Sequence, residues 1–228
     1  MSFTLYYHPL ASFCHKVLIG LYEKGTIFRA EIVDLPDQTS SAQFLSFWPV
    51  GKIPVLRDEQ RGRTVPETSI IIEYLEQHQP DAPPLLPANA ESALEVRLWD
   101  RFFDLYVQVP MQKIVVDRLR PAGQADVLGV DEARLNLRKA YALAEGQLQG
   151  RTWAASDAFS LADCAAAPAL FYANIVEPFS ASHPNLALYF ERLLARPSVA
   201  RTLREARPYF SMFPLQGAIP ARFLEGAA

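Results

Sequence analysis

The sequence predicts an α/β domain followed by an all-helical domain, and two observations support this order. Strand-like and helix-like segments alternate through residues 1–78, whereas the apolar residues beyond the following connector recur at helical spacing. The connector, residues 79–90, contains four prolines, which make it stiff and non-helical. We therefore expect an N-terminal domain at 1–78, a Pro-rich linker at 79–90 and a C-terminal helical domain at 91–228.

The N-terminal domain is predicted to begin with a strand, a helix and a second strand. Residues 3–7 are aromatic and β-favouring, and the next segment carries apolar residues at helical spacing up to Gly25, a typical helix C-cap. Residues 27–33 are read as the second strand. This order implies a parallel pair of strands with a crossover helix, and the βαβ unit followed by a ββα unit is the thioredoxin-like arrangement. The remaining loop, strand, hairpin turn and helix are expected at 34–41, 53–57, 58–63 and 69–77.

The C-terminal domain is predicted to be a helical bundle. Its first helix, at 91–119, is expected to be kinked by Pro110, and a second helix is expected at 131–148. Ser160 and Asp163 have the spacing of a capping box, and breaking such a cap costs about 0.5–2 kcal/mol. Two later helices have proline near their first turn, and an apolar tail is expected to fold back over the body; these segments are 184–194, 197–205 and 208–228.

Composition excludes several classes of function. The 228 residues carry a net charge of −3, which gives no attraction for nucleic acid, and 50% hydrophobic residues suit a soluble globule. We expect no signal peptide and no membrane segment, because the chain has neither a basic start nor a long apolar run. Cys14 and Cys164 lie far apart and show no metal-ligand spacing, so we expect no metal and a reducing, cytoplasmic location.

The stretch from residue 51 to residue 69 combines two unusual features. Pro54 stands at the entry of a strand, where proline turns the backbone and leaves Ile53 able to pair with an extended peptide. Glu67, Thr68 and Ser69 precede an apolar helix, and the free N–H groups of a helix start attract a carboxylate. One end of this stretch is therefore suited to a peptide backbone and the other to an anion.

These features, together with the order of segments along the whole chain, resemble the glutathione transferase superfamily. In that superfamily a cis-proline follows a residue whose backbone pairs with the cysteinyl part of glutathione, and a Glu/Gln-Ser/Thr pair at a helix start holds the γ-glutamyl group. The resemblance implies that Ile53 and Pro54 take the first role, and that Glu67 and Thr68 take the second. Lys52 stands where the superfamily often has a polar or basic residue near the tripeptide.

The resemblance also implies an activity. Members conjugate the thiolate of glutathione, their co-substrate, to an electrophilic small molecule, usually as homodimers, and such conjugation is associated with detoxification. A free thiol has a pKa of about 8.5, so the enzyme must favour the thiolate, and a hydroxyl donor near a helix N-terminus does this. The activating group is expected in the loop after the first strand.

The activating residue is left open between candidates. In serine- and cysteine-type members the activator stands three positions before Cys14, where this chain has Ala11. Ser12 is one step further along, and Tyr7 stands much as the catalytic tyrosine does in tyrosine-type members. Cys14 is a third candidate at the first turn of a helix, although its apolar periodicity favours a buried, inert thiol. Ordinary core packing is the alternative for Tyr7, as an aromatic residue.

Neighbouring residues carry weaker signals. His8 and His15 flank the loop and are expected to be solvated. Trp48 replaces the small polar residue common in the superfamily, and either packs under the loop or borders the glutathione pocket. A second substrate is implied against the first C-terminal helix, where we assign four residues to the exposed side by helical phase: Phe103, Tyr106, Gln108 and Met111. Plain core packing of Phe103 and Met111 is the alternative.

Three other functions share the same motifs. Cys14 would serve a glutathione-dependent thiol reductase, through mixed disulfides. Ala11 is the feature that favours a non-catalytic glutathione-binding or scaffold protein. An isomerase or dehalogenase that uses glutathione as a cofactor would have the same site.

Overall fold

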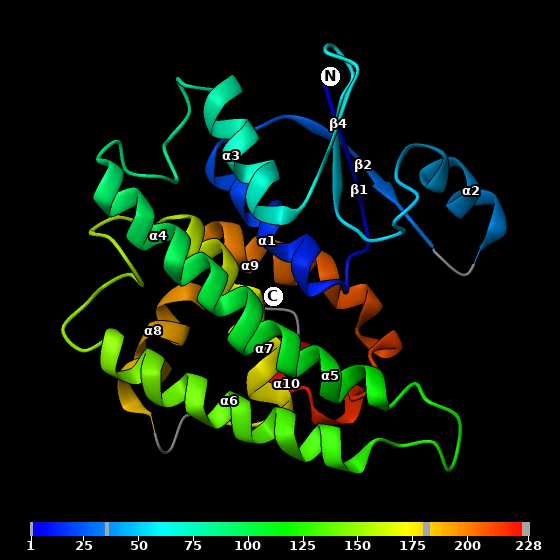
Figure 1. The fold of residues 1–228 in the computed structure, drawn as a ribbon, viewed down its shortest axis with the longest axis vertical. Helices are drawn as coiled ribbons and strands as arrows, with labels where there is room; N and C mark the ends of the chain where they lie inside the picture. Colours follow the sequence, from blue (N-terminus) through cyan, green and yellow to red (C-terminus); the bar gives the residue numbers. More distant parts are fainter. Residues whose placement is uncertain (1, 35–36, 180–182, 225–228) are drawn as a thin grey trace. The chain divides into compact units, whose positions relative to one another are not determined.

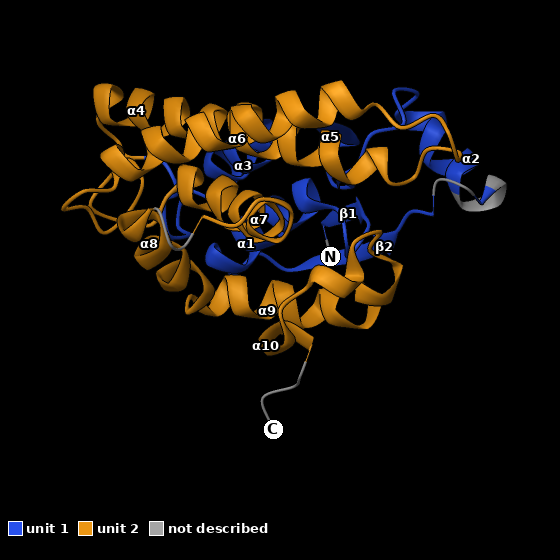
Figure 2. Ribbon diagram, turned by 90° about the horizontal axis from the view of Figure 1, so that it is seen from below, with its two compact units in different colours: residues 1–86 blue, residues 87–228 orange. Residues whose placement is uncertain are grey.

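The computed structural model describes residues 2–34, 37–179 and 183–224. The chain forms two compact units, residues 1–86 and 87–228 (Figure 2). The first unit holds a sheet with helices and the second holds helices, so the predicted fold class, an α/β unit followed by an all-helical one, is confirmed. The linker predicted at 79–90 stays a prediction, although the two units meet within it.

The first unit is built on a four-stranded mixed sheet with the order β2-β1-β3-β4. β1 pairs with β2 in parallel, as the predicted crossover requires, and β3 runs antiparallel to both β1 and β4. The strands and helices of this unit are β1 (Phe3–Tyr7), α1 (Ser12–Glu23), β2 (Phe28–Ile32), α2 (Gln38–Phe47), β3 (Val55–Asp58), β4 (Arg63–Pro66) and α3 (Thr68–His78).

The two faces of this sheet pack differently. α1 and α3 lie on one side of the sheet and α2 on the other (Figure 1). Because successive side chains of a strand point to opposite faces, Phe3 and Leu5 of β1 join the core with α1 and α3. Tyr6 points the other way and packs with Phe44 and the partly buried Phe47 of α2. Thr4 and Tyr6, which are both buried, therefore belong to the α2 side of the sheet.

One sequence-based expectation for this unit is wrong. The polar loop expected at 34–41 gives way to α2, which begins at Gln38, because the burial of Phe44 (1% exposed) against the sheet holds this helix in place.

Two lysines of this unit, Lys16 and Lys24, are buried, although lysine is rarely buried unless it is paired. Lys24 pairs with Glu76 of α3 across 2.7 Å and also donates to the carbonyl of Pro83.

The regular elements in the described part of the second unit are all helices, joined by loops. The predicted helix at 184–194 is confirmed, whereas α6 begins four residues earlier than predicted because Asp126 caps its N-terminus by accepting from the N–H of Gly129 at 2.9 Å. The helices are α4 (Ala90–Phe102), η1 (Phe103–Gln108), α5 (Val109–Asp117), α6 (Val127–Gln147), α7 (Leu161–Val176), α8 (Pro184–Leu194), α9 (Pro197–Ala206), η2 (Arg207–Met212), η3 (Gln216–Ala218) and α10 (Ala221–Leu224).

Pro110 interrupts the long helix expected at 91–119, and the interruption takes the form of a π-helical segment. η1 covers the six residues Phe103–Gln108, between α4 and α5. Proline has no N–H to donate and its ring crowds the preceding turn, so the backbone before it leaves the α-helical pattern. π-helical turns are rare and are often found at functional sites.

The predicted capping box at the start of α7 is confirmed. The Oδ2 atom of Asp163 accepts from both the N–H and the hydroxyl of Ser160, each at 2.9 Å. Its Oδ1 atom accepts from the N–H of Ala154 at 3.0 Å and from the hydroxyl of Tyr189 at 2.6 Å. One buried carboxylate therefore joins the loop before α7 to α8.

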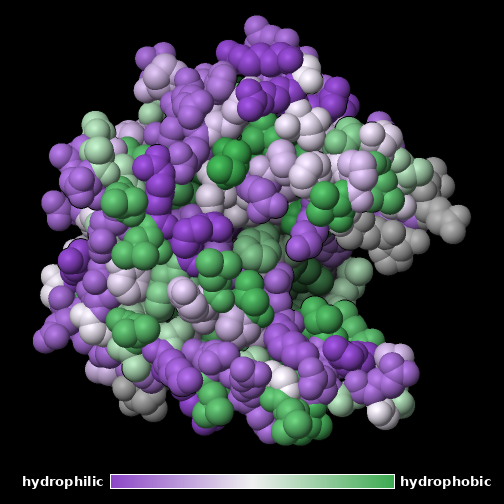
Figure 3. Space-filling view, viewed as in Figure 1, coloured by the Kyte–Doolittle hydropathy of each residue, from purple (hydrophilic) through white to green (hydrophobic). Residues whose placement is uncertain are grey.

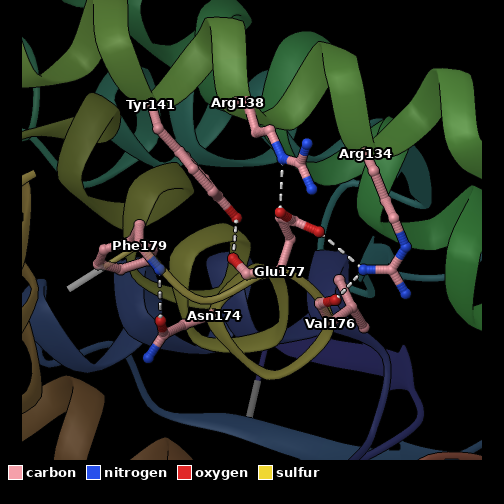
Figure 4. A network of polar contacts seen from close by, with 7 residues as sticks. All are labelled: Arg134, Arg138, Tyr141, Asn174, Val176, Glu177 and Phe179. Carbon is pink, nitrogen blue, oxygen red and sulfur yellow. Dashed lines mark hydrogen bonds and ion pairs between the residues drawn. The ribbon is translucent and has the colours of Figure 1, made fainter. Parts of the chain in front are cut away.

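The other end of α7 is closed by a second polar network, drawn in Figure 4. Glu177 follows the helix and accepts hydrogen bonds from Arg138 at 2.7 Å and Arg134 at 2.8 Å, both on α6. The hydroxyl of Tyr141 donates to the carbonyl of Glu177 at 3.0 Å. Burial tends to raise the pKa of Glu177, but the two guanidinium groups outweigh it and hold the pKa below its ordinary value.

The apolar tail folds back on its own unit, as predicted for the part that the structure describes. The ring of Phe210 stacks on Phe171 of α7 at 6.1 Å, and Phe213 packs against Tyr172 at 5.4 Å. Residues 225–228 of the predicted tail lie outside the described residues. On α4 and η1, by contrast, Leu94, Leu98 and Leu105 are half or more exposed, and Figure 3 shows hydrophobic side chains along this face.

Candidate functional site

The register of the sheet brings the candidate residues of the first unit to one end of it. Tyr6 of β1 lies opposite Val55 of β3, and Val55 lies opposite Pro66 of β4. The residues just beyond these partners, Tyr7, Pro54 and Glu67, therefore lie at the same edge. The helices α1 and α3 both begin near this edge, so their positive N-terminal ends face the same region.

The strand entry has the predicted backbone geometry. The peptide bond between Ile53 and Pro54 is cis. Pro54 is buried and Ile53 is partly buried against the cluster of Tyr6, Phe44 and Val55. β3 begins only at Val55, so Ile53 stands outside the ladder, where its backbone is suited to pair with an extended ligand. Lys52, two residues before this proline, is exposed.

The start of α3 has an unusual backbone conformation. Glu67 has φ of 66°, the only positive φ among the described non-glycine residues. Side chains other than glycine rarely adopt this conformation, and it persists where the surroundings fix it, often at functional sites. Glu67 occupies the N-cap position and is exposed, while Thr68 is the first residue of the helix and is 7% exposed.

The N-cap side chain leaves the start of α3 open. Within the described structure Glu67 forms no capping hydrogen bond. The hydroxyl of Ser69 instead accepts a hydrogen bond from the ammonium group of Lys16 at 2.9 Å. Lys16 is fully buried on α1, so this contact ties the two helices together beside the candidate site. One feature of the sequence indicates it, a lysine among apolar neighbours.

The loop after β1 holds the candidate activators. Ala11 is the N-cap residue of α1, and Ser12 is its first residue, 5% exposed. Ser12 thus lies in the first helical turn, where the positive end of the helix dipole favours an anion. Tyr7 ends β1 and packs partly buried against the core formed with α1 and α3.

Cys14 is a poor nucleophile in this structure. Its side chain is fully buried, and burial raises the pKa of the thiol to about 12, although a hydrogen bond to the backbone of His8 acts in the opposite direction. The expectation of a buried, inert thiol agrees with this environment.

His15 is not solvated, which corrects the sequence-based expectation. It is 1% exposed, and its Nε2 atom lies 2.5 Å from the carbonyl oxygen of Pro9. A carbonyl only accepts, so Nε2 carries the proton and donates. Burial lowers the pKa of His15 to about 4, because the hydrogen bond to Pro9 offsets only part of the desolvation and His8 adds a small lowering effect. The neutral ring therefore holds the loop against α1. The pKa of His8 is also lowered by burial.

Of the four residues assigned to the second substrate, three are not exposed. Phe103, Gln108 and Met111 are each 2% exposed or less, whereas Tyr106 is 59% exposed. The assignment to the exposed side assumed α-helical spacing, and the π-helical turn of η1 changes which side of the helix each of these residues faces. Both the Nε2 and Oε1 atoms of Gln108 are buried, and neither has a hydrogen-bond partner among the described residues.

The described residues hold no group of three or more side chains suited to binding a metal ion. Among those same residues, none of the helices combines the length and the apolar character needed to cross a bilayer. Trp48 is partly buried and packs against the cluster on the α2 side of the sheet.

Comparison with known families and structures gives consistent matches. A family model described as the N-terminal domain of glutathione S-transferase matches residues 11–78, and one described as its C-terminal domain matches residues 109–197. FtsZ-localized protein A of Caulobacter vibrioides is 33% identical over 174 residues, which are 72% of this chain and 74% of that protein. The glutathione S-transferase-like protein LUC7 of a Fusarium species is 32% identical over 58% of this chain, which spans only 59% of that relative.

Among solved structures, a glutathione S-transferase from Methylobacillus flagellatus KT, crystallised with GSH bound, matches with a TM-score of 0.80 and 26% identity. The match covers 88% of this chain and 98% of that one.

Proposed function

Because the chain belongs to the glutathione S-transferase superfamily, we propose that it is a glutathione transferase that conjugates glutathione to an electrophilic small molecule. The observation that carries the proposal is the single sheet edge shared by the cis-proline, the strained start of α3 and the first turn of α1. The related structure with GSH bound supports a glutathione site in this fold.

Each part of this edge has a role in the proposed complex. The backbone of Ile53, ahead of Pro54, pairs with the cysteinyl part of glutathione. Glu67 and Thr68 hold the γ-glutamyl group, whose carboxylate lies at the N-terminus of α3. Lys52 is exposed beside them and adds a positive charge near the tripeptide.

The proposed chemistry is nucleophilic attack by the thiolate. The thiol proton leaves to solvent and the sulfur forms a bond with the electrophilic carbon. In a substitution a leaving group departs with its electron pair, and in an addition the π bond at that carbon breaks and the resulting anion takes a proton from solvent. Ser12 is our first candidate for the donor that stabilises the thiolate, because it lies in the first turn of α1. Tyr7 is the second candidate, although its packing against the core suits a structural role equally well.

The second substrate is proposed to bind beside η1. Tyr106 offers an exposed ring, and the amide of Gln108 offers a donor and an acceptor that the described residues leave unpaired. Phe103 and Met111 would support this surface from beneath.

We also propose a homodimer, in which a second copy covers the exposed Leu94, Leu98 and Leu105. We further propose a cytoplasmic location, where both cysteines remain free.

An ultraviolet difference titration of bound glutathione tests the activity and names the activator. We expect the wild type to bind glutathione as a thiolate below neutral pH, and Ser12→Ala to lose that signal. Tyr7→Phe and Cys14→Ser are the comparison variants. A loss in Tyr7→Phe alone would transfer the role to the tyrosine. Glutathione bound as the neutral thiol in every protein would reject catalysis by thiolate stabilisation.

The glutathione site has its own test. Glu67→Ala and Thr68→Ala are each expected to weaken glutathione binding by about tenfold, since each removes a hydrogen bond to a charged group. Unchanged affinity in both variants would show that the site lies elsewhere.

The dimer has a separate test. We expect Leu98→Glu to elute as a monomer in size-exclusion chromatography with light scattering. Leu188→Glu, on the exposed face of α8, is the control and is expected to remain a dimer.

One specific observation favours a second candidate function. Ala11 occupies the position at which serine- and cysteine-type members carry the activating side chain. A protein that binds glutathione without activating it would fit this residue, and the same titration separates the two functions. A thiol reductase acting through Cys14 is disfavoured by the complete burial of that thiol.

A further inference from the structure

The α2 side of the sheet carries a depression separate from the glutathione site. It has a volume of about 760 Å³, within the range of small-molecule sites, and it lies entirely within the first unit. Its lining includes Thr4 and Tyr6 of β1, which point away from α1 and α3. None of the residues that we assign to glutathione lines it.

Two arginines flank the floor of this depression. Thr4 lies opposite Arg29 of β2 and opposite Arg57 of β3, so the three residues form one row across three strands. Neighbouring strands are about 4.8 Å apart, which places the two arginine backbones roughly 10 Å from each other. The side chains of both arginines line the depression. A small anion between them can contact both guanidinium groups.

Arg57 is held in a fixed orientation. Its Nε atom donates to Oε2 of Glu59 at 3.1 Å, its NH1 group donates to the hydroxyl of Thr64 at 3.2 Å, and its guanidinium carbon lies 5.7 Å from the centre of the Phe47 ring. The other oxygen of Glu59 accepts from the hydroxyl of Thr4 at 3.0 Å. The one carboxylate of the lining is thus engaged at both oxygens, and because the charges of Glu59 and Arg57 cancel, the lining keeps the net positive charge of one arginine.

Arg29 can exchange its partner at little cost. It pairs with Glu31 at 3.2 Å, but their side chains are 59% and 43% exposed. Exposed ion pairs of this kind contribute little to stability, so a ligand anion competes effectively with Glu31. Arg29 is therefore the adjustable contact, and Arg57 is the preformed one.

The depression also has an aromatic wall. The rings of Tyr6 and Phe47 lie 4.7 Å apart and both line it. Aromatic faces stack on flat rings, and arginine adds both charge and a planar surface. We propose that this depression binds a small aromatic anion, with the ring against Tyr6 and Phe47 and a carboxylate between Arg29 and Arg57.

Calorimetric titration with 2-naphthoate tests this site on the full-length protein. We expect wild-type binding that saturating S-methylglutathione leaves unchanged, and binding about tenfold weaker for Arg29→Gln. Ser46→Trp, which fills the depression from the exposed side of α2 without changing its charge, is expected to weaken binding as much. Arg201→Gln is the matched control, because Arg201 forms a similarly exposed pair with Glu205, and it is expected to bind as the wild type does.

The neutral 2-naphthamide serves as the control for charge and is expected to bind at least about tenfold more weakly than 2-naphthoate. The proposal is overturned if the wild type does not bind 2-naphthoate, if Arg29→Gln or Ser46→Trp binds it equally well, or if the amide binds as tightly as the acid. Displacement by S-methylglutathione would place the ligand in the glutathione site instead. Failure of glutathione to bind at all leaves this test unaffected, so the two proposals fail separately.

Discussion

The ammonium group of Lys16 donates a hydrogen bond to the hydroxyl of Ser69 across 2.9 Å, and so joins α1 to the first turn of α3. Lys16 is fully buried, and the two residues before Ser69, Glu67 and Thr68, form the proposed γ-glutamyl site. The contact therefore fixes the turn whose backbone is most strained.

Replacing this lysine should loosen the glutathione site. We expect Lys16→Met to keep the packed volume but to weaken glutathione binding by about tenfold, because the first turn of α3 loses its anchor. Stability should fall by about 1–3 kcal/mol, since buried polar groups lose a partner. Calorimetric titration measures the first effect and urea unfolding the second.

Lys24→Met provides the matched control, because Lys24 is a buried lysine of the same helix that bonds to Glu76, two turns further along α3. It should lose stability while keeping its affinity for glutathione. Equal losses of affinity in both variants would mean that the Lys16 effect is only general destabilisation.

His15 should make the protein sensitive to mild acid. Its pKa is lowered in the folded state from 6.5 to about 4, so the unfolded chain binds the proton first. The stability that this histidine contributes is fully present above pH 6.5 and is lost as the pH falls toward 4. The shift of about 2.5 units corresponds to roughly 3 kcal/mol.

His15→Gln, which retains an N–H donor for Pro9, isolates this effect. We expect the free energy of unfolding of the wild type to fall by about 3 kcal/mol more than that of the variant between pH 7 and pH 4. Urea unfolding at several pH values gives the difference. Parallel curves for the two proteins would show that the buried ring does not govern the acid response.

Asp163 is expected to be worth more than an ordinary helix cap. Its two oxygens accept four hydrogen bonds from buried donors, and in Asp163→Asn an amide would replace one oxygen and face donors in place of accepting from them. We expect a loss of about 2–5 kcal/mol in urea unfolding at neutral pH. Asp126→Asn, at the partly exposed N-cap of α6, should lose far less stability. Similar losses of stability in both variants would mean that Asp163 contributes no more than an ordinary helix cap.

Asp163 makes the free energy of unfolding depend on pH in the opposite direction to His15. Burial raises the pKa of Asp163, and the hydrogen bonds from Tyr189, Ala154 and Ser160 only partly offset it. The folded state therefore holds the proton more tightly than the unfolded state. The proton-linked part of the stability, which is separate from the hydrogen bonds compared at neutral pH, is fully present below the ordinary aspartate pKa and is lost as the pH rises through the folded value.

Cys14 should be inert to thiol reagents until the protein unfolds. A rise in pKa from 9.0 to about 12 reduces the thiolate fraction by about 1,000-fold, and burial blocks access as well. Iodoacetamide at pH 8, followed by mass spectrometry of the Cys14 peptide, should show slow modification in buffer and rapid modification in urea. Rapid modification of the folded protein would favour the thiol reductase function instead.

Apart from α2, the sequence by itself determined the order of the strands and helices in the first unit and the backbone signals of the site. Pro54 at a strand entry, Gly25 after α1 and the Ser160–Asp163 box are local features, because each depends on residues within a turn or two. The alternation of strand and helix patterns predicted the parallel pairing of β1 with β2, because two strands joined through a helix usually lie parallel and their crossover is almost always right-handed. These features were confirmed in the structure.

Only the tertiary structure decided which side of each helix is covered. Helical spacing shows that Phe103, Gln108 and Met111 share a side, but their burial depends on the surrounding chain and on the π-helical turn before Pro110. His15 is expected to be solvated, and a lysine is rarely buried, because polar side chains usually lie in water. Both are buried because Ser69, 53 residues along the chain from Lys16, and Pro9, in the loop before α1, supply the hydrogen bonds that make burial possible, and helical spacing reveals neither partner.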